Sequence, residues 1–177
     1  LVFSAARGHK AGVHFHPLFQ LQLMGLSGAF LTADLFNLFV FFEIMLAASY
    51  GLLLLGLQPN RVRASMQYVV VNLVASSFFL IGVALIYASA GTLNMADLAV
   101  RAASMDDSQR LLLEVGAAVL AITFLIKSAM WPLGFWLPTT YAAASPPVAA
   151  MLVLMTKVGV YVLLRLWLLV FAEQAEV

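Results

Sequence analysis

The sequence predicts an all-α membrane protein, a bundle of about five transmembrane helices of which one is broken. Of the 177 residues, 64% are hydrophobic and only 10% are charged, whereas soluble domains have about 45–50% apolar and about 25% charged residues. The apolar residues also gather in stretches of about 20, the length that a helix needs to cross the hydrocarbon core of a bilayer. Too few polar residues remain to cover the outside of a soluble core, so the surrounding solvent is expected to be lipid.

Charge and cysteine content exclude several classes of function. Nine Lys plus Arg against eight Asp plus Glu leave a net charge of +1, so no overall basic field attracts nucleic acid. The sequence has no cysteine, which excludes disulfides, thiol catalysis and cysteine-bound iron–sulfur clusters. It also has no glycine motif of the kind that holds phosphates. We therefore expect no cofactor and no enzymatic activity in the chain itself.

The first two predicted spans form a tight helical hairpin. Thr32-Ala33-Asp34 is the only polar break in some forty residues, and Asp34 is suited to cap the second helix; a role in proton uptake is the alternative for this carboxylate. The third span lies between the turn signals Gln58-Pro59-Asn60 and Gly91-Thr92. The predicted boundaries of these three spans are Phe15 to Ala33, Asp34 to Leu57 and Gln67 to Ala90.

The fourth span is predicted to be broken. It runs from Leu111 to Met130 and stops at Trp131-Pro132, because proline removes a backbone donor and ends or kinks a helix. The break is expected over residues 131–138. It either lies at membrane depth, as at ion sites of transporters, or the helix ends at the interface and a re-entrant or surface segment follows. The fifth span, from Pro147 to Phe171, follows a cap residue and prolines that fit a first helical turn.

Loop charges predict the orientation. The chain begins with Leu1 and has no signal-peptide layout, so we interpret it as internal sequence, with residues 1–14 as a loop and 15–177 as the membrane domain. By the positive-inside rule, the loops that contain most Lys and Arg face the cytoplasm. The protein is thus expected to be a multi-pass protein of the inner cell membrane. The cytoplasmic cations are Arg7, Lys10, Arg61 and Arg63, whereas Glu173 and Glu176 are expected outside.

Three histidines in or near the predicted N-terminal loop have spacing that could suit a metal. They are His9, His14 and His16. No Cys, Asp or Glu lies nearby in the sequence to complete a site. We interpret them as loop residues exposed to solvent and predict no metal site.

Three ionisable residues lie inside predicted spans: Glu43, Lys127 and Lys157. At 1.5 Å per residue, Glu43 lies about 13 Å from the start of its helix, Lys157 about 15 Å, and Lys127 about 18 Å along the apolar part of its helix. All three therefore share one depth. A charge there costs about 2.5–3.5 kcal/mol, which the surrounding Leu, Phe and Val residues can offset at about 0.3–0.6 kcal/mol each. Insertion is possible, but it does not explain why the charges are present.

Two interpretations of these residues remain open. Burial disfavours the charged form of any such group, so Glu43, Lys127 and Lys157 could exchange protons along a pathway. Alternatively, Glu43 and Lys127 form an ion pair that only fixes the helix register; this leaves Lys157 without a partner. Polar or small residues lie at helical spacing on the same predicted helices as the two lysines and on the third predicted span. For Thr123, Ser76 and Ser77 the favoured interpretation is close helix packing. The remaining positions in these rows are Gly116, Asn72, Tyr161 and Arg165.

Three segments together resemble a known family. They are Asp34-Leu-Phe-Asn-Leu-Phe-Val-Phe-Phe-Glu43-Ile-Met-Leu-Ala-Ala-Ser-Tyr50-Gly, Leu125-Ile-Lys127-Ser-Ala-Met-Trp131-Pro132 and Met155-Thr-Lys157-Val-Gly-Val-Tyr161. The sequence is similar to the antiporter-like membrane subunits, which join the Mrp-type cation/proton antiporters to the proton-pumping subunits of respiratory complex I. Within this family it most resembles the D subunits of Mrp antiporters.

The resemblance implies both a fold and residue roles. Family members have about fourteen helices in inverted repeats, and this chain resembles helices four to eight of the first repeat. Glu43 then matches a glutamate that pairs with the lysine of a broken helix, here Lys127, and Lys157 matches the lysine that passes the proton on. Complex I subunits usually have an Asp-Ala-His-x-Glu-Ala-Pro pattern after the broken helix. Here that segment reads Pro138-Thr-Thr-Tyr141-Ala-Ala-Ala-Ser-Pro146-Pro147, which favours the Mrp branch.

The sequence therefore predicts a membrane subunit of a monovalent cation (Na+)/proton antiporter. Its expected partners are the other subunits of the complex, protons, monovalent cations and the lipid bilayer. The alternative is a proton-pumping membrane subunit of a complex I-like NADH:quinone oxidoreductase, and a third possibility is a scaffold with inert buried charge pairs.

Overall fold

The computed structural model describes residues 13–55 and 59–170, and this part of the chain is helical without any strand. The all-α prediction is confirmed. The predicted positions of Arg7, His9, Lys10, Glu173 and Glu176 lie outside the described residues. The helices are α2 (Phe15–Leu31), α3 (Leu35–Leu54), α4 (Pro59–Ala90), α5 (Met95–Ala102), α6 (Asp107–Lys127), α7 (Leu137–Ala143) and α8 (Pro146–Val170).

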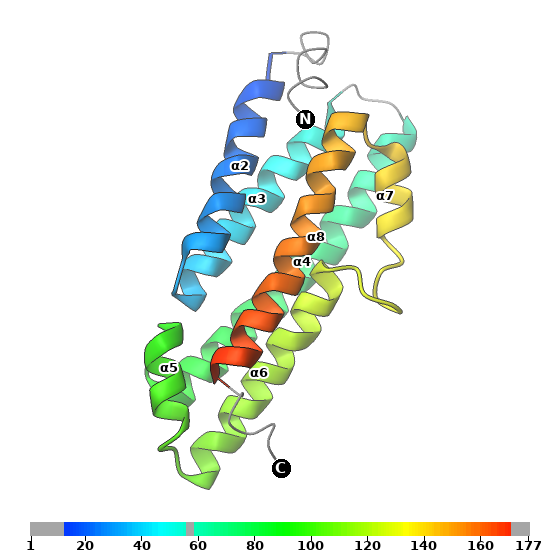
Figure 1. Cartoon of the computed structure of the whole chain (residues 1–177). Coiled ribbons are helices and arrows are strands. Elements are labelled where there is room, and N and C mark those ends of the chain that lie inside the picture. Colours follow the sequence, from blue (N-terminus) through cyan, green and yellow to red (C-terminus); the bar gives the residue numbers. More distant parts are fainter. Residues whose placement is uncertain (1–12, 56–58, 171–177) are drawn as a thin grey trace.

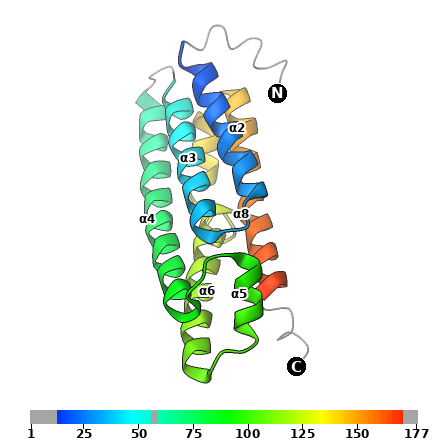
Figure 2. The same ribbon diagram turned by 90° about the vertical axis from the view of Figure 1, so that its left-hand side faces the viewer.

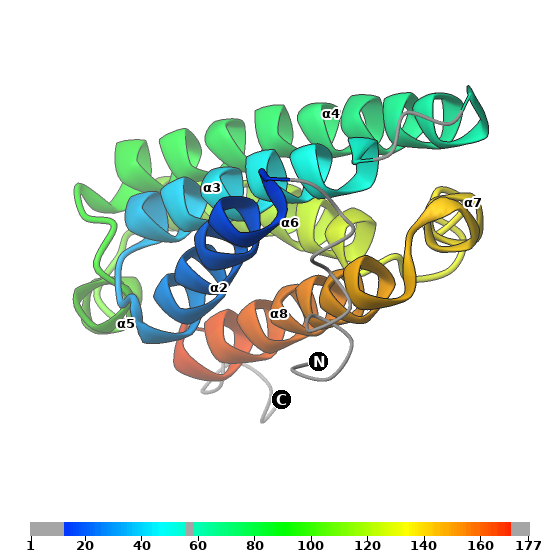
Figure 3. The same ribbon diagram turned by 90° about the horizontal axis from the view of Figure 1, so that it is seen from above.

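The long helices α2, α3, α4, α6 and α8 run side by side and alternate in direction, while the short helices α5 and α7 lie at opposite ends of the bundle (Figures 1 and 2). Seen from above, α4 and α8 lie on opposite sides, with α3 and α6 between them (Figure 3). Among the described residues, four helices are long and apolar enough to cross a membrane: α3, Val62–Ala90 of α4, α6 and α8. The first predicted span corresponds to α2, whose 17 residues extend about 26 Å.

The turn between α2 and α3 is joined to the turn between α4 and α5. Asp34 caps α3 by accepting hydrogen bonds from the backbone N–H groups of Phe36 and Asn37, both at 2.9 Å, as the sequence predicts. Asn94 caps α5 in the same way. Asp34 and Asn94 also face each other in an isolated antiparallel bridge. The two turns therefore fix the relative positions of two helix hairpins.

Removing the cap of α3 tests this arrangement. We expect Asp34→Ala to lower the stability of the protein by about 1 kcal/mol, because two N–H groups in the first turn lose their acceptor. Asp34→Asn keeps an acceptor oxygen and is expected to remain close to the wild type. Thermal unfolding in detergent checks the difference. Equal stability of the alanine and asparagine variants would contradict it.

Helices α4 and α6 pack closely at two glycines. A Cβ atom added to Gly116 would lie 3.2 Å from the carbonyl oxygen of Gly82 and 3.0 Å from the Ile86 side chain. A Cβ atom added to Gly82 would lie 3.1 Å from the carbonyl oxygen of Gly116. Small residues let membrane helices approach until their backbones touch. This contact sets the distance between α4 and α6, which both contribute to the site described below.

The end of α6 differs from the prediction. The helix ends at Lys127 and not at Met130, because Ala129 takes a left-handed conformation with φ of 53°. The N–H of Met130 then bonds to the Leu125 carbonyl, and the N–H of Ala129 bonds to the Ile126 carbonyl, which is the Schellman pattern of helix ends. The non-helical segment and α7 follow, and the Trp136 indole N–H donates to the Ile126 carbonyl at 3.1 Å. The break predicted at residues 131–138 is thus present and starts three residues earlier.

Two other boundaries were not predicted. Helix α4 begins at Pro59, eight residues before the predicted start, because a proline is tolerated in the first turn of a helix as well as in a loop. Helix α5 lies between the third and fourth predicted spans, where no helix was predicted. It is a short amphipathic helix in which Met95, Leu98 and Ala102 are buried. Its exposed side has the ion pair between Arg101 and Asp97.

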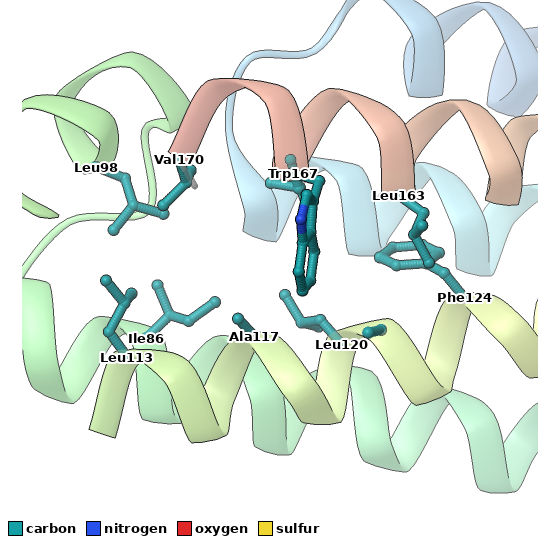
Figure 4. Close-up of a pocket in the computed structure, with 11 residues that line it drawn as sticks. Ile86, Leu98, Leu113, Ala117, Leu120, Phe124, Leu163, Trp167 and Val170 are labelled. Carbon is teal, nitrogen blue, oxygen red and sulfur yellow. The ribbon is translucent and has the colours of Figure 1, made fainter. Parts of the chain in front are cut away.

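An apolar pocket lies where α6 and α8 diverge toward α5 (Figure 4). Its volume is about 20 Å³. Ala117 and Leu120 of α6 face Leu163 and Trp167 of α8 across it. The outward faces of the long helices are apolar as well: Met66, Leu73 and Leu168, for example, are all more than half exposed. Such a surface is suited to lipid.

Candidate functional site

Glu43 and Lys127 lie close together in the bundle and are joined through a hydroxyl group. Glu43 projects from α3, Lys127 from the last residue of α6, and Ser76 from α4 between them. Lys127 Nζ donates a hydrogen bond to Ser76 Oγ at 3.2 Å, and Ser76 Oγ donates to Glu43 Oε1. Among the described residues, the direct ion pairs are Arg101–Asp97 and Arg110–Glu114. The acid and the amine are therefore connected by a hydroxyl bridge and not by direct contact.

Three features of the structure make a buried position acceptable for the Lys127 side chain, which is 4% exposed. Ser76 accepts one of its hydrogen bonds. The face of the Phe42 ring lies 5.3 Å from Nζ, a distance at which a cation is attracted to an aromatic ring. Lys127 also lies in the last turn of α6, where the partial negative charge of the helix end favours a cation. The break in the helix thus produces part of the electrostatic environment of the lysine.

A small cavity adjoins Lys127. Its walls include Tyr68, Asn72 and Trp136, and it has about 10 Å³ of space for the centre of a water molecule, close to the 10–15 Å³ that one buried water requires. Asn72 is 2% exposed and donates to the Tyr68 carbonyl at 3.0 Å. Lys127 has further N–H donors besides the one directed to Ser76. The cavity is therefore close to the size of one water molecule, and the amine lies in its wall.

A larger cleft, lined by polar side chains and alanines, lies between α4 and α7. Its walls include Arg63, Gln67 and Thr139, and the Thr139 hydroxyl donates to Gln67 Oε1 at 3.4 Å. Tyr68 follows Gln67 in α4, and Trp136 lies just before α7. Their rings are in contact, with centroids 5.3 Å apart. The same two rings line the cavity beside Lys127.

Lys157 is not brought to the other two charges. Its side chain is exposed on α8, and it has no hydrogen bond or ion pair with any residue in the described ranges. It follows Met155, which lines the cavity beside Lys127, but the alternation of buried and exposed positions directs it to another face of α8. The expectation that all three groups face one common interior therefore holds for Glu43 and Lys127 within the described residues, and not for Lys157.

The polar row that follows Lys157 along α8 contacts the end of α2. The Tyr161 hydroxyl donates to the Phe30 carbonyl at 3.4 Å, and Arg165 Nη1 donates to the Thr32 carbonyl at 2.7 Å. The last carbonyls of a helix have no partner within the helix, so these two side chains satisfy them. Tyr161 and Arg165 thus hold α2 against α8.

Sequence reasoning assigned Ser76 to helix packing, and the structure gives it a different place. The hydroxyls of Ser77 and Thr123, interpreted in the same way, do bond to carbonyls of their own helices. Ser76 instead contacts both charged groups. One feature of the sequence could have indicated this role of Ser76: Asn72 and Ser76 lie one turn apart on one face of α4. In the structure, Asn72 lines the cavity beside Lys127 and Ser76 bonds to Lys127.

In the described ranges no three His, Asp or Glu residues gather as metal ligands would.

Comparisons with known proteins show what the sequence is similar to. The family model of the NADH:quinone oxidoreductase/Mrp antiporter transmembrane region matches residues 32–177. The D subunit of a probable K(+)/H(+) antiporter from Rhizobium meliloti is 63% identical over 173 residues, which cover 98% of this chain and 32% of that protein. The D subunit of a Na(+)/H(+) antiporter from Alkalihalophilus pseudofirmus is 45% identical over 170 residues, with 96% of this chain and 34% of that protein covered.

Solved structures agree with the sequence comparison. A chain of the Mrp complex from Dietzia sp. superposes with a TM-score of 0.82 at 41% identity, covering 90% of this chain and 30% of that one. A chain of an archaeal membrane-bound sulfane sulfur reductase gives a TM-score of 0.77 at 38% identity, covering 87% and 31%. The chain spans about a third of the length of these relatives. With its apolar helices and broken α6, it belongs to the NADH:quinone oxidoreductase/Mrp antiporter transmembrane family.

Proposed function

We propose that this chain acts in a monovalent cation/proton antiporter of the Mrp type, in which protons move through Glu43, Lys127 and Lys157. The proposal depends above all on one observation, the hydrogen-bonded connection from Glu43 through Ser76 to the buried Lys127. The antiporter D subunits among the relatives support it. The partners would be other antiporter subunits in the inner cell membrane, with Na+ or another monovalent cation exchanged for protons.

Proton movement follows from the electrostatic coupling of the three groups. A nearby opposite charge favours the charged form of a group and a nearby like charge disfavours it, so groups that interact strongly titrate together. When Lys127 is connected to Glu43, its charge is balanced; when the connection opens, the charge of Lys127 acts on Lys157. A change of only about 1.4 kcal/mol in this interaction shifts a protonation equilibrium about tenfold. Lys157 would then pass its proton to a group outside this chain's described residues, across the face of α8 that is exposed here.

The experiment is cation-driven proton movement in everted vesicles that contain the full assembled complex. We expect Glu43→Gln and Lys157→Ala to reduce exchange by about a hundredfold or more, because groups that transfer protons contribute about 10²–10⁴-fold. Glu114→Gln is the matched control, because Glu114 is an exposed carboxylate paired with Arg110 on α6. Expression and assembly are measured in the same membranes. Wild-type exchange in Glu43→Gln or in Lys157→Ala would refute the role of that residue.

The second candidate is a membrane subunit of a redox-driven proton pump. The superposition on an archaeal respiratory membrane complex favours it, and the family includes NADH:quinone oxidoreductases. The two candidates differ in their source of energy. An antiporter moves protons when a sodium or potassium gradient is imposed alone, whereas a redox-driven pump requires electron transfer from a donor such as NADH.

A further inference from the structure

The hydroxyl of Ser76 bonds to charged side chains on two other helices. Five other helical hydroxyls of the described chain donate to a carbonyl three or four residues earlier in their own helix, as Ser and Thr commonly do. They are Ser49, Ser77, Ser89, Thr123 and Thr156. Ser76 instead donates across to Glu43 on α3 and accepts from Lys127 on α6. A packing role does not require this geometry, since the neighbouring Ser77 satisfies its hydroxyl locally.

We infer that the Ser76 hydroxyl conducts the proton between Lys127 and Glu43. This inference rests on the proposed function, because it names the atom through which two members of the relay exchange a proton. A hydroxyl has one donor hydrogen and two acceptor lone pairs. It can therefore accept from the amine and donate to the carboxylate at the same time, which an aliphatic side chain cannot do.

The transfer balances without any further reactant. An N–H bond of the Lys127 ammonium breaks as an O–H bond forms at Ser76 Oγ, and the original O–H bond of Ser76 breaks as one forms at Glu43 Oε1. The products are a neutral amine, a neutral carboxylic acid and a hydroxyl that still has one hydrogen. Both hydrogen bonds remain, with donor and acceptor exchanged. The reverse transfer restores the ion pair by the same steps.

The location makes both states accessible. Ser76 and Lys127 are each 4% exposed, and removing an ion pair from water costs several kcal/mol per ion unless hydrogen bonds compensate. A neutral amine and a neutral acid avoid this cost, and the Ser76 hydroxyl keeps a hydrogen bond to each of them. The pair can thus change from charged to neutral without separating charge. A neutral Lys127 is then able to accept a proton from a water molecule that enters the adjoining cavity.

Four variants test the inference in the full assembled complex, with cation-driven proton movement in everted vesicles as the measurement. Ser76→Ala and Ser76→Val remove the hydroxyl, whereas Ser76→Thr keeps it and has nearly the shape of valine. Ser77→Ala is the matched control on the same helix. We expect exchange per assembled complex to fall at least about tenfold in Ser76→Ala and Ser76→Val. Ser76→Thr is expected to keep most of the exchange, and Ser77→Ala all of it.

The outcomes separate the hydroxyl from the shape of the residue. Near-normal exchange in Ser76→Ala or Ser76→Val would overturn the inference, and so would equal loss in Ser76→Thr and Ser76→Val. If Ser76→Ala does not assemble, the Thr and Val variants decide the question, because they fill similar space and differ in the hydroxyl. Glu43→Gln is measured beside them. Loss in Glu43→Gln with normal exchange in Ser76→Ala would reject the hydroxyl and leave the proposed function intact, whereas normal exchange in Glu43→Gln would reject the relay itself.

Discussion

Replacing Lys127 by arginine is expected to stop proton-coupled exchange as completely as replacing it by methionine, a reduction of about a hundredfold or more. Arginine keeps the positive charge and can donate hydrogen bonds toward Ser76 and Glu43. Its guanidinium group cannot be deprotonated in proteins, so it cannot deliver a proton. If Lys127 only anchors α6 to α3 by its charge, Lys127→Arg should instead retain most of the exchange.

The measurement compares Lys127→Arg, Lys127→Met and the wild type in everted vesicles, with exchange expressed per assembled complex. Thermal stability of the purified complex is recorded in parallel. The methionine variant removes the charge and leaves Glu43 with Ser76 alone. If Glu43 and Lys127 are an inert scaffold pair, Lys127→Met should lower the thermal stability. Lys127→Arg should then keep near-normal exchange and near-normal thermal stability. Such a result would contradict the relay and favour the scaffold interpretation.

The charges themselves could be found from the sequence, but the link between them could not. Glu43 and Lys127 are recognisable because an ionisable residue in an apolar helix is rare and costly, and counting residues from each helix start gives similar depths. Depth does not determine the direction of a side chain around the helix axis. Lys157 shares the depth and nevertheless lies on an exposed face of α8. Ser76 could not be identified because a serine in a membrane helix is common, and most such hydroxyls bond to their own helix.

Helix ends show the same division between strong and weak signals. Asp34 could be predicted as a cap because an Asp between two apolar runs is a specific signal, and the structure confirms it. The end of α6 was predicted three residues too late, because it depends on Ala129 in a left-handed conformation. Glycine is the usual residue at such a position. The conformation here follows from the fold of the next segment: Gly134 lies so close that an added Cβ would clash with the Ala129 carbonyl oxygen.

The broken helix explains how the fold accommodates a lysine at this depth. If α6 continued as an ideal helix, the carbonyls around Lys127 would all bond to N–H groups of the next turn. The break leaves the helix end beside the amine, and a cation is favoured there. It also allows Trp136 to return to the Ile126 carbonyl and close one wall of the adjoining cavity. One local change of backbone therefore provides both the electrostatic stabilisation and the space for water.

The spacing of α4 and α6 is the second requirement of the site, and Gly116→Leu is expected to disrupt it. A side chain at position 116 would press on Leu85, Ile86 and the backbone of Gly82, since even its Cβ would lie 3.0–3.2 Å from their atoms. Overpacking of this kind costs about 1–3 kcal/mol. Because Ser76 lies on α4 and Lys127 on α6, a wider spacing would also lengthen their 3.2 Å hydrogen bond. We expect lower thermal stability and lower exchange together.

Ala117→Leu is the matched control for Gly116→Leu. Ala117 is the next residue of α6, and its side chain faces the apolar pocket between α6 and α8 (Figure 4). The added atoms extend toward this apolar pocket and away from the Gly82 backbone that position 116 meets, so they avoid the clash that position 116 imposes. Thermal unfolding of the purified complex and exchange in vesicles should therefore change little in Ala117→Leu and fall strongly in Gly116→Leu. Equal behaviour of the two variants would show that the contact between Gly82 and Gly116 does not set the distance on which the Ser76 bridge depends.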